Sequence, residues 1–330
     1  MLPIFRLWLV DVGVSQLFAD ALNEELANDI LAQENEALVK SEEVAALSQQ
    51  WTTYRGRHIG TDEIRSWYQQ TDSVRDQRIL FELLKRTKVF SEAHIRERLR
   101  AAHSILRPSL PEFVTRRRGE RRKDVVVTYI DGEGKSGASH ASNYAEENRI
   151  SADCVLSRAA FGDQFRKHVE INQSPAAVVI IDDIAATGKS LASNICSFLD
   201  EFRSLLSGVK VRVLTLVATE AAQSKILARI GEIDEVDIDF RSCEILPPEA
   251  FAFPDNATVW RSSEEEARAR ALCNDLGVRI YPRSPLGYGG MGLLVVFPTT
   301  VPNNSLPILH SRSRTSSQHR WEPLFPRVTN

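Results

Sequence analysis

The sequence contains little cysteine, and its cysteines are not spaced like those of a metal site. The four thiols stand far apart and form no CxxC pair: Cys154, Cys196, Cys243 and Cys273. This spacing argues against a zinc site and against the disulfide framework of a small secreted fold. Because free thiols persist where the surroundings are reducing, the pattern favours a reducing compartment.

Long apolar runs are also missing. The apolar stretch over residues 2–10 is short, is interrupted by Pro3 and Arg6, and has neither the basic flank nor the cleavage site of a signal peptide. No other stretch approaches the length of a membrane span. We therefore expect a cytoplasmic location and no membrane partner.

Charge of one sign is not in excess. The 330 residues are 43% hydrophobic and 26% charged, with 41 Lys and Arg against 44 Asp and Glu, which gives a net charge of −3. This composition is ordinary for a globular protein. It creates no global field that would attract nucleic acid or an acidic membrane, so any binding of a polyanion must come from a local cluster.

One dense basic cluster precedes the first predicted strand. Its members are Arg116, Arg117, Arg118, Arg121, Arg122 and Lys123. Two interpretations stay open for it. The cluster could contact the phosphates of RNA or DNA, where Lys and Arg supply affinity that does not depend on base sequence. Alternatively, it is an exposed linker whose charges are solvated.

Hydrophobic periodicity divides the chain into three regions. Residues 1–112 are predicted to be a helical N-terminal region, because apolar residues recur there at a spacing of three and four from Val14 onward. Thr61 and Ser91 are predicted to cap two of its helices. Residues 124–245 are predicted to form an α/β core, and residues 246–330 a C-terminal extension that packs on the core.

The predicted core alternates apolar strands with amphipathic helices. The strands are expected at 125–130, 177–181, 210–218 and 236–240, and the helix after the third strand at 220–230. Such alternation predicts an α/β fold with a mostly parallel, doubly wound sheet that helices cover on both faces. Ligands of such sheets bind at the carboxyl ends of the strands, where two glycine-bearing loops follow strands here.

The second of these loops has the chemistry of a ribose-phosphate site. Four apolar residues, 178–181, form a buried strand, and Asp182 and Asp183 follow it. Their carboxylates can accept strong hydrogen bonds from a vicinal diol. The small residues after them let backbone N–H groups turn towards a phosphate, the hydroxyls of Thr187 and Ser190 add donors, and the helix that follows adds a favourable dipole.

Two other interpretations of this segment are weaker. A Walker A loop would place a glycine five residues before Gly188, where the sequence has Asp183, so we reject it. A buried strand followed by an Asp-capped helix without a ligand is the remaining structural alternative.

Residues 178–190 resemble the signature of type I phosphoribosyltransferases, in which four apolar residues, two acids, an apolar residue and two variable residues precede Thr-Gly-x-Ser/Thr. The resemblance implies that Asp182 and Asp183 engage the ribose hydroxyls of 5-phosphoribosyl 1-diphosphate (PRPP), directly or through Mg²⁺ and water. It further implies that the backbone of the following residues holds the 5-phosphate: Ala185, Ala186, Thr187, Gly188, Lys189 and Ser190. Superfamily enzymes that act on 6-oxopurines usually have an acid before the Thr. Ala186 stands there, which disfavours hypoxanthine and guanine as acceptors.

The first loop, residues 132–137, lies where the superfamily binds pyrophosphate. The resemblance therefore implies pyrophosphate contacts from Gly134, Lys135, Ser136 and Gly137, and we expect Lys135 to neutralise the leaving group. Its glycines also spell GxGxxG, so a dinucleotide loop and a plain turn remain open. A mobile loop normally supplies a further catalytic residue, for which the interval 150–175 offers Arg158, Arg166, Lys167 and His168, unless these are ordinary helix charges.

The later sequence is similar to the PRTase-CE family, a group linked to bacterial conflict and antiphage defence systems. The similarity lies in residues 285–289, 292–297, 302–309 and 321–327, and the helical stretch 64–84 fits the helical prefix of that family. The segment 302–305 is either a rigid turn or a loop that closes over a ligand. Trp321 and Phe325 are predicted packing anchors.

This resemblance implies a phosphoribosyltransferase-like effector that binds PRPP or a ribose 5-phosphate nucleotide with Mg²⁺. Whether it is an enzyme stays open. The alternative is a non-catalytic module that senses PRPP or a nucleotide and regulates or bridges partner proteins or nucleic acid.

Overall fold

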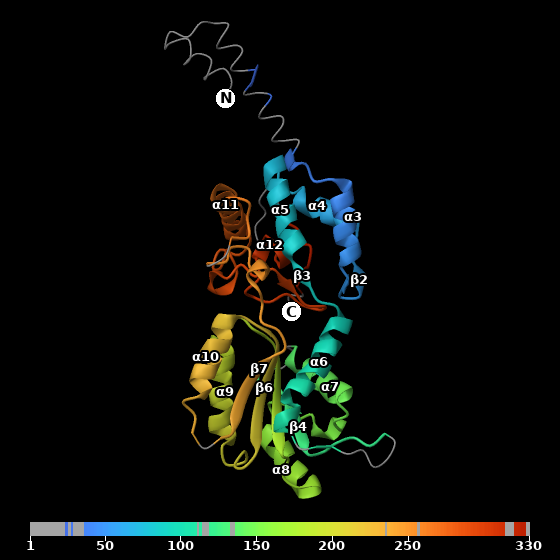
Figure 1. Cartoon of the computed structure of the whole chain (residues 1–330), viewed down its shortest axis with the longest axis vertical. Helices are drawn as coiled ribbons and strands as arrows, with labels where there is room; N and C mark the ends of the chain where they lie inside the picture. The colour runs from blue at the N-terminus through green and yellow to red at the C-terminus, as the bar shows by residue number, and fades with distance from the viewer. Residues whose placement is uncertain are drawn as a thin grey trace. The chain divides into compact units, whose positions relative to one another are not determined.

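The computed structural model describes residues 24, 25, 28, 36–110, 112–113, 119–132, 136–234, 236–255, 258–313 and 320–327. Most of the helix expected from Val14 lies outside these residues, and its described positions 24, 25 and 28 are helical. The chain divides into two compact units, each built from separate segments (Figure 1). We call Lys88–Val259 with Gly287–Ser305 the sheet unit, and Met1–Thr87 with Trp260–Leu286 and Leu306–Asn330 the helical unit.

The sheet unit contains a four-stranded parallel sheet in the order β4-β5-β6-β7. Its strands are β4 (Val125–Thr128), β5 (Ala177–Ala185), β6 (Lys210–Ala218) and β7 (Ile238–Ser242). Helical crossovers join successive strands, so that every strand starts at the same end of the sheet. The alternation of strands and helices in the sequence predicted this arrangement. The α/β fold with a parallel sheet is therefore confirmed.

Helices cover both faces of this sheet (Figure 1). One core joins the strands to α6 (Glu92–Leu106) and α7 (Gly137–Glu147). The other core joins them to helices on the opposite face: α8 (Phe161–Asn172), α9 (Lys189–Phe202) and α10 (Glu220–Ile230). Since β5 and β6 are apolar on both sides and central in the order, they fix the frame on which the loops stand.

A second, two-stranded parallel sheet completes this unit. β3 (Lys88–Val89) pairs with β8 (Val295–Val296), and the Phe90 and Phe297 rings that follow the two strands stack with centroids 5.3 Å apart. The unit also contains short 3-10 turns: η1 (Arg107–Ser109), η2 (Ala152–Cys154), η3 (Pro248–Ala250) and η4 (Tyr288–Gly290).

The helical unit consists of helices and a hairpin. Its elements are α3 (Ser41–Gln50), β1 (Thr53–Tyr54), β2 (Arg57–His58), α4 (Thr61–Tyr68), α5 (Val74–Arg86), α11 (Ser263–Ile280) and α12 (Pro307–His310). Trp321 and Phe325 are buried in it, and the Nε1 groups of Trp67 and Trp321 both donate to the Ile308 carbonyl oxygen, over 3.2 and 2.8 Å. Their predicted role as packing anchors is confirmed.

Several local predictions are refined. Ser91 caps α6 by accepting from the His94 amide, as predicted. Gly60, rather than Thr61, is the N-cap of α4, because the Glu63 carboxylate reaches back to the Gly60 amide over 2.7 Å. The compact units cross both predicted region boundaries, since α6 packs on the sheet and residues 287–305 belong to the sheet unit. No helix among the described residues is both long and apolar enough to span a membrane.

Candidate functional site

The two acids of the predicted site lie within β5, near its carboxyl end. Asp182 pairs in register with Thr215 of β6, and the strand continues through Asp183 to Ala185. The sequence analysis expected the acids after the strand, because polar residues ended the apolar run. Backbone pairing with the equally long β6 extends the strand beyond that run. The Asp183 amide donates to Asp182 Oδ1 over 2.8 Å, which fixes the Asp182 carboxylate against the next residue.

The loop after β5 is short and tightly held. Thr187 and Gly188 turn the chain, and α9 begins at Lys189 with Gly188 as its N-cap at a φ of 69°. A Cβ at position 188 would lie 2.9 Å from the Ala222 carbonyl oxygen, so only glycine fits without a shift. The Lys189 amide donates to Thr187 Oγ1 over 3.4 Å. The first amides of a helix have no partner within the helix, and such amides are donors that can bind a phosphate.

Thr219 holds this loop from the neighbouring strand end. Its hydroxyl donates to the Ala186 carbonyl oxygen over 2.7 Å and accepts from the Ala222 amide over 3.0 Å as the N-cap of α10. One side chain therefore ties the loop after β5 to the helix after β6. Ala185 and Ala186 are buried, Thr187 is half-buried, and Lys189 and Ser190 are exposed. The predicted phosphate-binding residues thus form one contiguous turn with an exposed outer side.

The first glycine-bearing loop meets the second at this edge. Ser136 Oγ donates to Asp183 Oδ2 over 2.6 Å. A Cβ on Gly137 would lie 2.2 Å from Asp131 Oδ1 and 2.9 Å from Tyr129 Cβ, so the absence of a side chain at 137 makes room for the Asp131 carboxylate. Gly134 and Lys135 lie outside the described residues. The pyrophosphate role of this loop stays a prediction.

Negative charge accumulates where the loops meet. Burial of the Asp182 carboxyl, and then the charges of Asp183 and Asp131, raise its pKa well above the ordinary range, although the Asp183 amide acts in the opposite direction. Close like charges disfavour ionisation in this way. A perturbed carboxyl at a loop-lined sheet edge is typical of a functional site.

His140 is a residue of this edge that the sequence analysis missed. It lies one turn into α7, and its amide donates to the Ser136 carbonyl oxygen over 3.0 Å. Burial lowers its pKa, while the charges of Asp183 and Asp131 oppose that shift. Its Nδ1 is buried and has no hydrogen-bond partner among the described residues. The four-residue spacing from Ser136 was the one available signal.

The basic residues considered for a mobile loop make contacts on α8 and nearby. Arg158 pairs with Glu201 over 2.5 Å and lies over the Phe198 and Phe202 rings. Arg166 pairs with Asp163 on the surface, and His168 is buried. These contacts suit ordinary helix packing, and the mobile-loop role stays a prediction.

The basic cluster divides in a similar way. Arg122 is only 3% exposed, and its guanidinium donates to both carboxylate oxygens of Asp124 over 2.9 Å, so it belongs to the core rather than to a basic surface. Arg121 donates to the Ile150 carbonyl oxygen, and Lys123 is exposed. Arg116, Arg117 and Arg118 lie outside the described residues. Contact with nucleic acid stays a prediction for the other five residues of the cluster, since Arg122 is buried.

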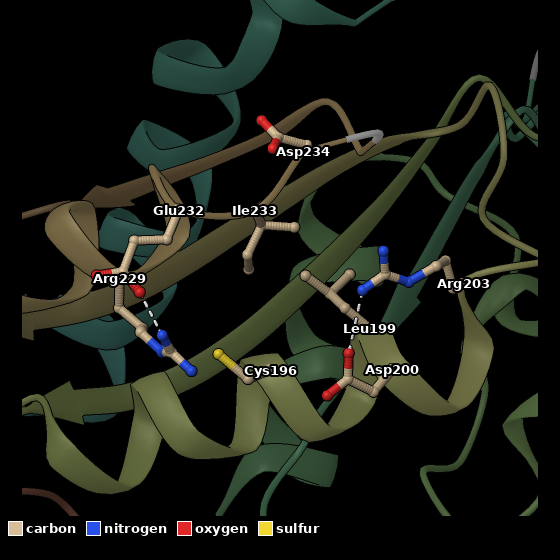
Figure 2. A pocket seen from close by; sticks show the side chains of 8 residues that line it. All are labelled: Cys196, Leu199, Asp200, Arg203, Arg229, Glu232, Ile233 and Asp234. Carbon is tan, nitrogen blue, oxygen red and sulfur yellow. Dashed lines mark hydrogen bonds and ion pairs between the residues drawn. The ribbon is translucent and has the colours of Figure 1, made fainter.

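A pocket of about 360 Å³ lies elsewhere in the sheet unit, beside the last turns of α9 and α10 (Figure 2). It is lined by Cys196, Leu199, Asp200, Arg203, Arg229, Glu232, Ile233 and Asp234. Four of its charged groups form two ion pairs, Arg229 with Glu232 and Arg203 with Asp200, and Asp234 adds a further carboxylate. None of the predicted site residues lines it.

Comparison with known proteins places the chain in a family. The profile of PRTase-CE matches residues 64–327. No curated protein matches the chain. Among solved structures, the crystal structure of TT1426 from Thermus thermophilus is similar over 54% of this chain and 95% of that chain, with 14% sequence identity and a TM-score of 0.26. Since the family profile spans well over half of the sequence, the chain belongs to the PRTase-CE family.

Proposed function

We propose that the protein binds PRPP or a ribose 5-phosphate nucleotide at the turn between β5 and α9. The observation that carries this proposal is the arrangement around Gly188: two acids near the end of β5, a left-handed glycine, and the N-terminus of α9 directly after it. The amides and the hydroxyls of Thr187 and Ser190 suit a 5-phosphate. Asp182 and Asp183 lie in the strand that leads into this turn, and their carboxylates suit the two ribose hydroxyls.

The residues also suit Mg²⁺ held jointly with the ligand. Among the described residues no three His, Cys, Asp or Glu side chains converge as a metal site. Mg²⁺ commonly keeps several waters and is bound by one or two carboxylates together with substrate phosphates. Burial and then the charges of Asp183 and Asp131 raise the Asp182 pKa, and a divalent cation beside Asp182 and Asp183 would offset both effects by stabilising the ionised carboxylates. When bound, it would neutralise charge on the ligand phosphates.

In a transfer reaction, the bond from C1 of the ribose to diphosphate would break with its electron pair going to the diphosphate. An acceptor would form the new bond to C1 and pass its proton to the departing diphosphate or to water. Positive charge develops on the sugar, next to the carboxylates of Asp182 and Asp183, which would stabilise it. Lys135 is the residue of the first loop that we propose to neutralise the leaving diphosphate. Ala186 offers no side-chain base, which disfavours a 6-oxopurine acceptor.

The proposed biological setting is a bacterial antiphage defence system, in which such a protein would act as an effector. This follows from the family resemblance rather than from the geometry. Transfer and sensing share the same ribose-phosphate site, because both need the ligand to be held at the same turn. Formation of a ribosylated product from PRPP would favour the enzyme, whereas binding without product for any acceptor would favour the sensing module.

Binding is tested by thermal melting with Mg²⁺ and PRPP, ribose 5-phosphate or a nucleoside monophosphate. A ligand well above its Kd raises the melting temperature. Asp182→Asn combined with Asp183→Asn should abolish the shift while the apo protein still folds. The matched control is Asp163→Asn combined with Asp200→Asn, two acids on α8 and α9 whose ion pairs lie at the surface. An unchanged melting temperature of the wild type with every ligand would contradict the proposal.

A further inference from the structure

The two edges of the four-stranded sheet are covered to different extents. β4 forms one edge, and the chain after α7 lies along it. The Leu156 amide donates to the Val127 carbonyl oxygen over 2.9 Å, and the Thr128 hydroxyl donates to the Leu156 carbonyl oxygen over 2.9 Å. β7 forms the other edge, and no strand or bridge among the described residues pairs with its outer side. β7 is therefore the open edge of the sheet.

The register between β6 and β7 shows which backbone groups point away from the sheet. At one end of the pairing, the Asp237 carbonyl oxygen accepts from the Val211 amide over 2.8 Å. At the other end, the Cys243 amide donates to the Thr215 carbonyl oxygen over 3.0 Å. The odd-numbered residues of this segment therefore direct their backbone groups towards β6. Successive residues of a strand direct these groups to opposite sides, so the even-numbered residues direct theirs outwards: Ile238, Phe240 and Ser242.

The side chains of β7 alternate between the two faces of the sheet. Phe240 is 2% exposed and belongs to the core that contains α9 and α10, and Ile238 packs against that core. Asp239 and Arg241 lie on the opposite face, where Arg241 Nε donates to Asp239 Oδ2 over 2.8 Å. The Arg241 side chain is 58% exposed and that of Asp239 is 35% exposed. The open edge thus carries one acid and one base, placed symmetrically about Phe240.

This arrangement is complementary to a second copy of itself. In an antiparallel pairing of two β7 strands centred on Phe240, Asp239 of each copy lies opposite Arg241 of the other. The outward backbone groups of the two Phe240 residues would exchange hydrogen bonds, so positions 239 and 241 form the pairs without backbone hydrogen bonds, in which opposing side chains lie closest. Opposite charges at such positions stabilise the pairing, and like charges destabilise it. Pairing centred on Asp239 or on Arg241 would instead place like charges opposite each other.

We propose that β7 is a homodimer interface, at which two copies of the chain pair antiparallel about Phe240 and join their sheets into one. Such an interface is isologous, because each copy contributes the same surface. The pairing provides partners for backbone groups that are otherwise a template for non-specific strand addition. Since β7 has five residues, the contact is small, and we expect a Kd in the micromolar range. The inference is independent of the proposed ligand site.

The test measures association of the full chain by sedimentation velocity over about 1–200 µM. The wild type should convert from monomer to dimer as its concentration rises. Asp239→Arg places two basic side chains opposite each other, and Arg241→Asp places two acidic ones opposite each other. Each change alters both symmetry-related contacts of the dimer, so each should raise the Kd about tenfold or more.

Two combinations restore the complementary charges. An equimolar mixture of the two single variants pairs a chain that has two bases with a chain that has two acids, and it should form a heterodimer. The double variant, Asp239→Arg with Arg241→Asp, exchanges the charges within one chain and should form a homodimer whose Kd lies within about threefold of the wild type. Arg166→Asp, which reverses the charge of a surface pair on α8, is the matched control and should leave the Kd unchanged.

Three outcomes would overturn the proposal. A wild type that stays monomeric over the whole range would leave the edge to an extended segment of another protein or to no partner. A dimer whose Kd is the same in all β7 variants would show that another surface holds the copies together. Dimer loss in the double variant and in the mixture, as well as in the single variants, would exclude the antiparallel register. Thermal melting of each variant checks that the fold is retained, so that a loss of association is not a loss of folding.

Discussion

The two ends of α9 differ in how their charges are balanced. At its start, burial of the Asp182 carboxyl, together with the nearby charges of Asp183 and Asp131, raises the Asp182 pKa. Near its end, the pocket has more lining charges, but Arg203 pairs with Asp200 and Arg229 with Glu232 (Figure 2). A cavity in which most of the lining charges are already paired offers little to a charged ligand. Carboxylates that lie close together without a cationic partner indicate a ligand site better than a pocket lined by ion pairs does.

The largest expected effect comes from the turn at the start of α9. Gly188→Ala should destabilise the protein by about 3 kcal/mol, because a Cβ would strain a φ of 69° and meet the Ala222 carbonyl oxygen at 2.9 Å. Gly208→Ala is the matched control: its φ is 74°, but nothing lies within 4 Å of its Cβ, so we expect a loss of about 1 kcal/mol.

Denaturant unfolding of both variants checks this difference. Equal losses would mean that strain alone matters and that the packing of Gly188 on α10 contributes nothing. Loss of ribose 5-phosphate binding in the Gly188 variant only would extend the difference from stability to function.

A smaller effect, of opposite sign, is expected at Asp182. The raised pKa means that the folded state favours the protonated carboxyl. Its stabilising contribution is complete below the unfolded pKa, near 4, and is lost as pH rises through the folded pKa. Asp182→Asn keeps the acceptor for the Asp183 amide and removes the charge. It should therefore be about 1 kcal/mol more stable than the wild type at pH 8, with no such gain at pH 4.

Unfolding measured across this pH range checks the sign. Asp200→Asn, in the balanced pocket, is the control and should show no comparable gain at pH 8. A variant at Asp182 that is less stable than the wild type at pH 8 would show that the three carboxylates are already compensated.

The smallest effect is expected in the pocket. Arg229→Gln combined with Glu232→Gln removes a surface ion pair that solvent screens, so we expect no measurable change in the free energy of unfolding. It should also leave nucleotide binding unchanged. A marked loss of nucleotide affinity in this double variant would show that the pocket near the end of α9 takes part in ligand binding.

Much of the sheet could be predicted from the sequence because its signals are local. β6 and α10 begin and end at the predicted residues. The apolar run of β6 and the helical periodicity of α10 each end at a clear change in the sequence pattern. β5 runs four residues further than predicted. Its extension is stabilised by pairing with a neighbouring strand, which no local pattern of polarity records.

The site was only partly predictable for the same reason. Asp182, Asp183 and the turn to α9 follow one another in the chain, so a motif could find them. The contact between Gly289 and Thr187 joins residues about a hundred positions apart, and the Ser136–Asp183 hydrogen bond joins residues 47 apart. His140 gave only a weak signal, its four-residue spacing from Ser136, because a single histidine on a predicted helix has no distinctive pattern of its own.

The pairing of β3 with β8 has a consequence for the order of events during synthesis. The Lys88 amide donates to the Leu294 carbonyl oxygen, and the Phe90 amide to that of Val296, across about two hundred residues of chain. A ribosome releases the four parallel strands long before residues 287–305. The nascent sheet unit must therefore wait with β3 unpaired and without the contact of Gly289 on Thr187, a state open to chaperones and to proteases.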